Sequence, residues 1–411
     1  MGQNTTIEWC DHTFNPWRGC AHRVLPNGTE HPGCAHCYAE AMSKRNPTLL
    51  GEWGEHGIRV CAAPEYWRQP EKWNRQAELD GCRRLVFCAS MADVFEDWDG
   101  LIFDHANGAL FKCRCGWQGT AAPHKDHPTE WRHCPQRGST RAMTMDDMRS
   151  DLFDLIYTTP NLDWLLLTKR PELAAAWLRE ERANIEYDDH TDPFANVWLG
   201  TSISSQATAD ALVPELFKCR DLVPVLFLSI EPLLGPVDLR SIADDGHNAV
   251  NCLTGNALKN DDLISVPTVD WVIVGGESGH HARPMHPDWV RSLRDQCAAF
   301  DVPFFLKQWG EWAPSDSVPN EPQEVPTTIL KGTTAECVVM RRPSQSICWV
   351  DTDGPVNIIG EDGKFTGDAP RGVCMTRAGK HAAGRLLDGR AHSEFPAPSF
   401  TPNLSPAEPA Q

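Results

Sequence analysis

The segment Trp164-Leu165-Leu166-Leu167-Thr168-Lys169-Arg170-Pro171 decides the fold, because a continuous apolar run ends abruptly in charged residues. Similar short runs, rich in β-branched and aromatic residues, lie at 85–89, 197–201, 225–230, 271–274 and 304–307. Helix-length segments such as 147–158 and 288–300 separate them. Buried parallel strands joined by helices have this pattern. We therefore expect an α/β fold, a barrel or partial barrel of parallel strands.

Polar side chains follow each run where it ends. They are Ser90 and Asp93, Lys169 and Arg170, Ser202, Glu231, Glu277, and Lys307 and Gln308. In barrels the C-terminal ends of the strands carry the chemistry. Any one of these residues could simply be a cap or a loop residue, but their recurrence over six runs predicts one shared site.

Three cysteines, Cys20, Cys34 and Cys37, precede the helix-like run AEAMSKR. A [4Fe–4S] cluster normally takes four thiolates, so a trio leaves one iron free for a ligand other than protein. Zinc is an equal alternative on spacing alone, since Zn²⁺ readily accepts three cysteines and one histidine. Candidate fourth ligands are His22, His31 and His36.

A second group of cysteines lies between residues 111 and 141. Cys113-Arg114-Cys115-Gly116-Trp117 and the stretch around Cys134 resemble the two knuckles of a zinc ribbon, with Arg137 where a fourth cysteine is expected. His124, His127 or His133 could complete the site. The segment holds six Lys or Arg residues against two acids, so it could bind nucleic acid or serve only as a structural staple.

Composition bounds the remaining possibilities. With 411 residues and 41% hydrophobic residues, the chain can form a substantial core. The formal charge of −18 argues against a uniformly basic nucleic-acid surface. We find no apolar run near 18 residues and no leader-like start, so we expect no membrane association and a cytoplasmic location. Clustered cysteines in such a chain indicate reduced thiols and metal ligation.

Several motifs resemble a three-cysteine family of phage and bacterial proteins of largely unknown function. The resemblance covers most of residues 5–312 and resumes at 379–395. The motifs that carry it are Ile7-Glu8-Trp9, Asn15-Pro16-Trp17-Arg18-Gly19-Cys20, Pro32-Gly33-Cys34-Ala35-His36-Cys37-Tyr38-Ala39-Glu40, Ser90-Met91-Ala92-Asp93, Leu167-Thr168-Lys169-Arg170-Pro171, Glu231-Pro232-Leu233, Gly275-Gly276-Glu277-Ser278-Gly279 and Lys307-Gln308-Trp309-Gly310.

The cysteine trio and the barrel pattern in turn resemble radical S-adenosylmethionine (SAM) enzymes. That resemblance implies a radical SAM-like partial TIM barrel in which Cys20, Cys34 and Cys37 hold a [4Fe–4S] cluster. In these enzymes SAM binds the open iron. An electron from a donor such as flavodoxin or ferredoxin then splits the sulfonium of SAM and releases a 5′-deoxyadenosyl radical. Two departures stand out: thirteen residues separate Cys20 from Cys34 instead of three, and His36 replaces the usual aromatic residue.

The same resemblance suggests roles for the strand-end residues. The expected SAM-binding residues are His36, Ser90, Asp93, Ser202 and Glu231, and those expected at the substrate are Lys169, Glu277 and Lys307. In radical SAM enzymes a Gly-Gly-Glu motif holds the amino group of SAM after the second strand. Here Gly275-Gly276-Glu277 follows a late strand, so Ser90 and Asp93 are the better candidates for that group.

Phage relatives of radical SAM type rearrange hypermodified thymidine in viral DNA, moving a glycine substituent from nitrogen to carbon attachment. We therefore expect DNA or a modified nucleotide as the substrate, in the cytoplasm of a bacterial host if the chain is phage-encoded. The main alternative is a non-enzymatic zinc-binding module attached to nucleic acid. A hydrolase or deaminase is weaker, because no His-x-Glu pairs with Cys-x-x-Cys at the deaminase spacing.

The expected organisation follows from these patterns. Residues 1–110 form the first part of the barrel with the cluster loop, 111–141 a zinc-ribbon-like insertion, 142–312 the rest of the barrel, 313–376 an irregular insertion or small β appendage, 377–395 a C-terminal helix and 396–411 a disordered tail.

Overall fold

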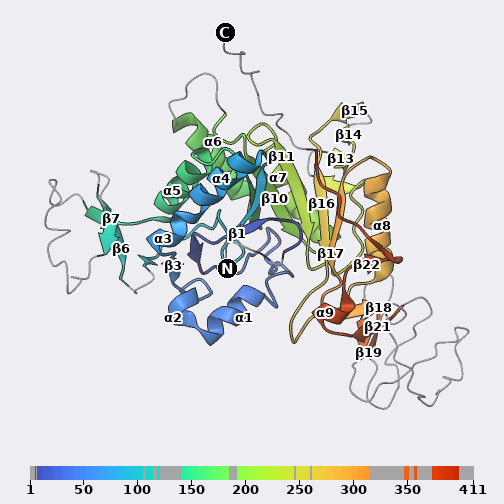
Figure 1. The fold of residues 1–411 in the computed structure, drawn as a ribbon. Helices are drawn as coiled ribbons and strands as arrows, with labels where there is room; N and C mark the ends of the chain where they lie inside the picture. Colours follow the sequence, from blue (N-terminus) through green and yellow to red (C-terminus); the bar gives the residue numbers. More distant parts are fainter. Residues whose placement is uncertain are drawn as a thin grey trace, which may run out of the picture.

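The computed structural model describes residues 5, 7–104, 108–113, 118–120, 140–184, 192–244, 247–259, 262–314, 347–350, 356–358 and 373–397. Its centre is a parallel seven-stranded sheet that forms a half-barrel (Figure 1). In spatial order the strands are β1 (His12–Phe14), β4 (Arg84–Cys88), β9 (Leu162–Thr168), β10 (Val197–Ile203), β11 (Val225–Ile230), β16 (Trp271–Gly275) and β17 (Phe304–Gln308). The predicted α/β class and parallel strands are confirmed, but β1 and β17 end the strand order and do not pair with each other, so this sheet is not a closed barrel.

Alternation along the strands gives the sheet two different faces. On the convex face, Leu166, Leu199 and Leu228 join the main hydrophobic core. The concave face carries a separate, mostly aromatic cluster: Trp9, Phe87, Leu165, Trp198, Val225, Phe227, Trp271, Ile273 and Phe305. We call it the aromatic floor. It fills the inside of the half-barrel below the C-terminal ends of the strands.

Helices connect the strands and cover the convex face (Figure 1). The longer ones are α4 (Gln69–Asp80), α5 (Met145–Tyr157), α6 (Pro171–Asn184), α7 (Gln206–Phe217) and α8 (Pro287–Ala298). Local sequence sets their ends: Thr144 and Asp147 form a capping box at the start of α5, and Gly81 ends α4 in the left-handed conformation at φ 64°. Shorter helices are α1 (Tyr38–Arg45), α2 (Pro47–Leu50) and α3 (Pro64–Trp67).

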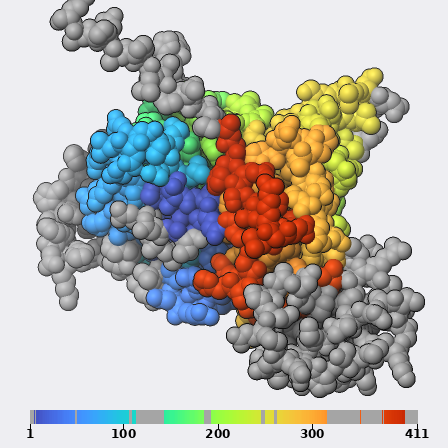
Figure 2. All heavy atoms as spheres, turned by 45° about the vertical axis from the view of Figure 1, so that its right-hand side comes forward, coloured from blue at the N-terminus to red at the C-terminus, as the bar shows by residue number. Residues whose placement is uncertain are grey.

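Both ends of the described chain pack on the open side of the half-barrel. Trp9 packs against Trp271 and Phe87, with ring centroids 6.3 and 4.6 Å apart. From the other end, Ser393 pairs with Phe305 of β17, and the Trp271 indole donates to Glu394 O at 2.8 Å. Figure 2 shows the red C-terminal segment lying against the dark blue N-terminal one. These contacts take the place of further barrel strands.

The prediction of a C-terminal helix over 377–395 is wrong. Only α9 (Lys380–Ala383) is helical, and β22 (Leu386–Leu387) pairs with β23 (Arg390–Ala391) after it. Gly384, Asp388 and Gly389 have φ values of 64°, 51° and 76°. A continuous helix cannot pass through such left-handed positions.

Smaller sheets are attached to the half-barrel. Between β11 and β16 the sequence analysis missed an antiparallel sheet of β12 (Ile242–Asp244), β13 (His247–Asn251), β14 (Asn256–Lys259) and β15 (Asp262–Ser265). The expected β appendage contains β18 (Trp312–Pro314), β19 (Ile347–Val350), β20 (Val356–Ile358) and β21 (Val373–Arg377). Near the N-terminus, β2 (Trp17–Arg18), β3 (Arg59–Cys61) and β5 (Ile102–Phe103) form a third sheet.

The predicted zinc-ribbon-like insertion is described only in part. β6 (Leu110–Cys113), β7 (Gln118–Thr120) and β8 (Thr140–Ala142) form a small antiparallel sheet. Cys115, Cys134 and the side chain of Cys113 lie outside the described residues, as does the tail at 398–411. Among the described helices, none has the length and apolar character needed to cross a membrane.

Candidate active site

Residues 20–37, here called the cysteine loop, are fixed over the C-terminal ends of the strands. The His31 ring donates through Nε2 to Ser202 O of β10 at 2.9 Å. Arg283, which follows β16, donates to Pro32 O at 2.9 Å. Directly after the loop, the Tyr38 hydroxyl donates to Ser90 O, beyond β4, at 2.7 Å. These contacts tie the segment that carries the three cysteines to three different strand ends.

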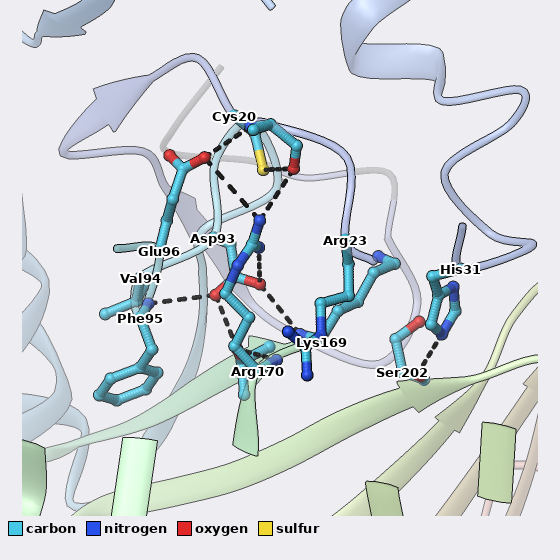
Figure 3. Close-up of polar contacts among 12 residues, drawn as sticks. Cys20, Arg23, His31, Asp93, Val94, Phe95, Glu96, Lys169, Arg170 and Ser202 are labelled. Carbon is cyan, nitrogen blue, oxygen red and sulfur yellow. Dashed lines mark hydrogen bonds and ion pairs between the residues drawn. The ribbon is translucent and has the colours of Figure 1, made fainter. Parts of the chain in front are cut away.

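The peptide after Cys20 is held by a group of buried charges, the buried charge network of Arg59, Asp93, Glu96 and Arg170. Figure 3 shows the last three beside Cys20. Arg59 forms two 2.7 Å bonds to the Glu96 carboxylate. The peptide after Cys20 is gripped on both sides, because Ala21 N–H donates to Glu96 and Arg170 donates to Ala21 O. Two positive and two negative side chains balance, which permits their burial.

Asp93 lies at the centre of this network rather than in an open site. Its carboxylate accepts hydrogen bonds from Thr168 Oγ1 at 2.6 Å, Lys169 N at 2.9 Å, Arg170 Nη1 at 2.9 Å and Phe95 N at 3.1 Å. Burial alone would raise the pKa of Asp93, but Arg170 and these donors outweigh it and leave the pKa below its ordinary value. The carboxylate therefore anchors the loop through protein contacts.

In the described part of the chain, Lys169 is hydrogen-bonded only through its backbone N–H, while its ammonium makes no hydrogen bond or ion pair and acts on Asp93 by charge alone. Burial raises the pKa of the Cys20 and Cys34 thiols, and Lys169 acts on both in the opposite direction. A metal that binds these thiols must displace their protons, and a nearby ammonium favours that step.

Glu231 and Lys307 form an ion pair at the mouth of the half-barrel, with Lys307 Nζ 2.8 and 2.7 Å from the two carboxylate oxygens. Gln308 adds a bond to Glu231 at 3.3 Å. Ser202 lies nearby, and its hydroxyl donates to Glu231 O at 3.4 Å. The structure thus joins two side chains that the sequence analysis assigns to different ligands.

The late Gly-Gly-Glu motif has a packing role. A Cβ on Gly275 would lie 3.2 Å from Glu231 Cδ, and one on Gly276 would lie 1.9 Å from Trp309 O. Glu277 is bound by Arg283 through bonds of 2.6, 2.7 and 2.8 Å. Burial raises the pKa of Glu277, and the Arg283 bonds outweigh this and lower it overall.

The three candidate histidines have protein partners. His31 donates from one ring nitrogen and accepts from Gly33 N–H at 3.0 Å with the other. His36 Nδ1 lies 3.3 Å from Glu277, and His22 lies 3.0 Å from both Glu30 and Glu40. In the described ranges, no three His, Cys, Asp or Glu side chains surround one point as ligands of a single metal ion. A cluster places each thiolate on a different iron, so it does not require that arrangement.

Sequence reasoning missed Arg283, Glu96 and Arg59, which hold the cysteine loop and the peptide after Cys20. Arginine and glutamate are normally exposed, so nothing in the local sequence marks Arg59 and Glu96 as buried. Arg283 follows Glu277 by six residues in a stretch without periodicity, which gives no signal of pairing.

A protein-family model matches residues 4–102 and 139–396 of the chain and passes over 103–138. Its description is "Protein of unknown function (DUF5131)". The chain belongs to this family. No curated protein and no solved structure matches it. The family places most of the chain, including the cysteine loop and all seven strands of the half-barrel, in one recurrent unit without naming its activity.

Proposed function

We propose that this member of the DUF5131 family is a radical SAM enzyme in which Cys20, Cys34 and Cys37 hold a [4Fe–4S] cluster. The observation that carries the proposal is the position of the cysteine loop. It is fixed over the C-terminal edge of a parallel half-barrel, where strand ends supply Ser202, Glu231 and Lys307. In barrel enzymes this edge is where substrates react.

The donors fit such a cluster in type and in charge. Three thiols match the three ligands that leave one iron open, and the unpaired Lys169 ammonium suits the negative charge that thiolates bring. A cluster held by the three cysteines would supply one electron, delivered by a flavodoxin or ferredoxin, for the cleavage of SAM into methionine and a 5′-deoxyadenosyl radical, which would take a hydrogen atom from the substrate. The three candidate histidines already contact protein partners, so none is free to be the fourth ligand of a zinc site, and this favours the cluster.

The protein residues then have three tasks. Asp93, Arg170 and Glu277 act on the chemistry through the cysteine loop, because their polar atoms are bound to protein partners. Lys169 binds an anionic group of the substrate. The aromatic floor below the mouth excludes water from the inside of the half-barrel.

For the substrate we propose a glycine-modified thymidine in phage DNA, isomerised from nitrogen-linked to carbon-linked glycine. Hydrogen abstraction from an unactivated carbon calls for radical chemistry rather than acid–base chemistry. The opposite charges of Lys307 and Glu231 match the carboxylate and amine of such a substituent. An isomerisation leaves the mass of the nucleoside unchanged.

The test is anaerobic incubation of the reconstituted protein with dithionite and SAM, with 5′-deoxyadenosine measured by chromatography. Wild type should release it, Cys34→Ala should not, and Cys82→Ala, which changes an exposed cysteine outside the loop, should behave as wild type. With glycine-modified DNA, nucleoside mass spectrometry should show a retention shift at constant mass. A brown, reconstituted protein that never releases 5′-deoxyadenosine would refute the proposal, and a colourless zinc protein would favour the zinc-binding module.

A further inference from the structure

The Glu231–Lys307 ion pair is built by two special features of the sheet. Trp271 and Ile273 of β16 face the aromatic floor, so Gly275 continues the same face, and its missing side chain leaves room for the pair. On β17 the register shifts by one residue, because Val274 pairs with Leu306 but Gly275 pairs with Gln308. Lys307 is the extra residue. Lys307 lies two residues after Phe305 and faces the concave side by ordinary alternation, and the bulge brings the next side chain, Gln308, to the same side, so both reach across β16 to Glu231 at the end of β11.

The pair is open to a ligand, unlike the charges under Cys20. The Glu231 and Lys307 side chains keep 22% and 20% of their exposure, whereas those of Arg59 and Glu96 keep 0% and 2%. Around Lys307, the described partners are the Glu231 carboxylate and the Trp9 ring, whose centroid lies 6.0 Å from the ammonium. The ammonium can therefore take a second anion in place of one carboxylate oxygen.

We propose that Glu231 and Lys307 form a binding site for a zwitterion, the ammonium and carboxylate end of an α-amino acid. A ligand that carries both charges can exchange partners with the pair: its carboxylate binds Lys307 and its ammonium binds Glu231. An uncompensated charge in a half-buried site costs free energy, and this exchange leaves neither protein charge without a partner. A ligand with one charge would satisfy one side chain and strand the other.

Gln308 supports this exchange from behind the pair. Its amide nitrogen lies 3.3 Å from both Glu231 Oε1 and Ser278 Oγ. It can hold the carboxylate of Glu231 in place while Lys307 moves toward the ligand. Below the pair, the aromatic floor is buried, with no member more than 7% exposed, so it keeps water away from the underside of the ion pair.

Two ligands carry such a zwitterion: the methionine end of SAM, and an amino-acid substituent on the substrate. The inference rests on the proposed function for the identity of either ligand, but the binding itself needs neither iron nor reductant. Failure of zwitterion binding is therefore distinguishable from failure of SAM cleavage.

Calorimetric titration of the full chain tests the site with S-adenosylhomocysteine, L-methionine and glycine. The one-charge controls are 3-(methylthio)propylamine and 4-(methylthio)butanoate for methionine, and methylamine and acetate for glycine. The double variant Glu231→Gln/Lys307→Met removes both charges without stranding either. Arg179→Met/Asp221→Asn is the matched control, since it removes an exposed ion pair of 2.8 Å.

At least one zwitterion should bind wild type at least about tenfold more tightly than its one-charge analogues do. Its affinity should fall about tenfold to a hundredfold in the Glu231/Lys307 variant and stay unchanged in the Arg179/Asp221 control. Loss confined to S-adenosylhomocysteine and L-methionine identifies the cofactor end, and loss confined to glycine identifies the substrate substituent. One-charge analogues that bind wild type as well as the zwitterions do, or no zwitterion binding at all, would overturn the proposal even if the variant fails to fold.

Discussion

The buried charge network under Cys20 and the ion pair at the mouth of the half-barrel use the same side-chain chemistry in different surroundings. In the network, Asp93 accepts four hydrogen bonds and Arg59 and Glu96 are bound to each other by two. At the mouth, Glu231 and Lys307 keep about a fifth of their exposure, and Lys169 has no partner in the described residues. Satisfied charges fix a loop, whereas incompletely satisfied charges remain free to bind.

The comparison predicts that the network, not the mouth, carries stability. Asp93→Asn should lower the free energy of unfolding by about 3–5 kcal/mol, because the buried charge network would keep two arginines against one carboxylate. Urea unfolding measures the change. Asp221→Asn, which breaks the exposed pair with Arg179, is the control and should cost at most about 1 kcal/mol. Equal losses in the two variants would contradict the distinction.

Alanine substitutions at Gly275 and Gly276 compare a neighbour that can move, the Glu231 side chain, with one that cannot, the Trp309 backbone. Gly276→Ala should destabilise by about 3 kcal/mol, since its Cβ would collide with the backbone oxygen of Trp309. Gly275→Ala should cost only about 1 kcal/mol, because the Glu231 side chain can shift. The same urea experiment ranks them. The reverse order would mean that Glu231 is held as firmly as the buried charge network.

His31 makes the attachment of the cysteine loop sensitive to acid. Burial lowers the pKa of His31 to about 3 from an ordinary value near 6.5. The unfolded chain therefore takes up a proton that the folded protein does not, and stability present above about pH 6.5 is lost as the pH falls toward 3. The loss is at most about 1.4 kcal/mol per pH unit.

His31→Gln should flatten this slope by the equivalent of one proton, as measured by unfolding between pH 6.5 and 5. His56→Gln changes an exposed histidine and should leave the slope as in wild type. Parallel slopes for wild type and His31→Gln would show that His31 does not couple the loop to pH.

The smallest effect is expected at the mouth. The double variant Glu231→Gln/Lys307→Met should change the free energy of unfolding by less than about 1 kcal/mol, because the pair is partly exposed and the double change leaves neither charge unpaired. The same variant should nevertheless weaken zwitterion binding. A stability loss as large as that of Asp93→Asn would make the ion pair structural.

Six of the seven strands were predictable, because apolar runs such as 225–230 are long enough to stand out from the helices. β1 was missed, since His12-Thr13-Phe14 is too short and mixed to give a pattern. The C-terminal helix predicted over 377–395 does not form, because the left-handed residues at 384, 388 and 389 interrupt it.

The strand-end residues were predictable as a group, but their partners were not. Asp93 and Glu231 look alike in the sequence: each is a carboxylate close behind an apolar run. Whether such a group is saturated or open depends on distant residues, here Arg170 for Asp93 and the bulged Lys307 for Glu231. Sheet order and a one-residue register shift decide these contacts, and neither is visible in a single sequence.

Cluster content after anaerobic reconstitution tests directly whether the cysteine loop holds an iron–sulfur cluster. Iron, sulfide and visible absorption should be compared in wild type, Cys20→Ala, Cys34→Ala, Cys37→Ala and the control Cys82→Ala. We predict about four irons in wild type and in Cys82→Ala, with the chromophore lost in each of the other three variants. Full iron and an unchanged spectrum in Cys34→Ala would contradict the account.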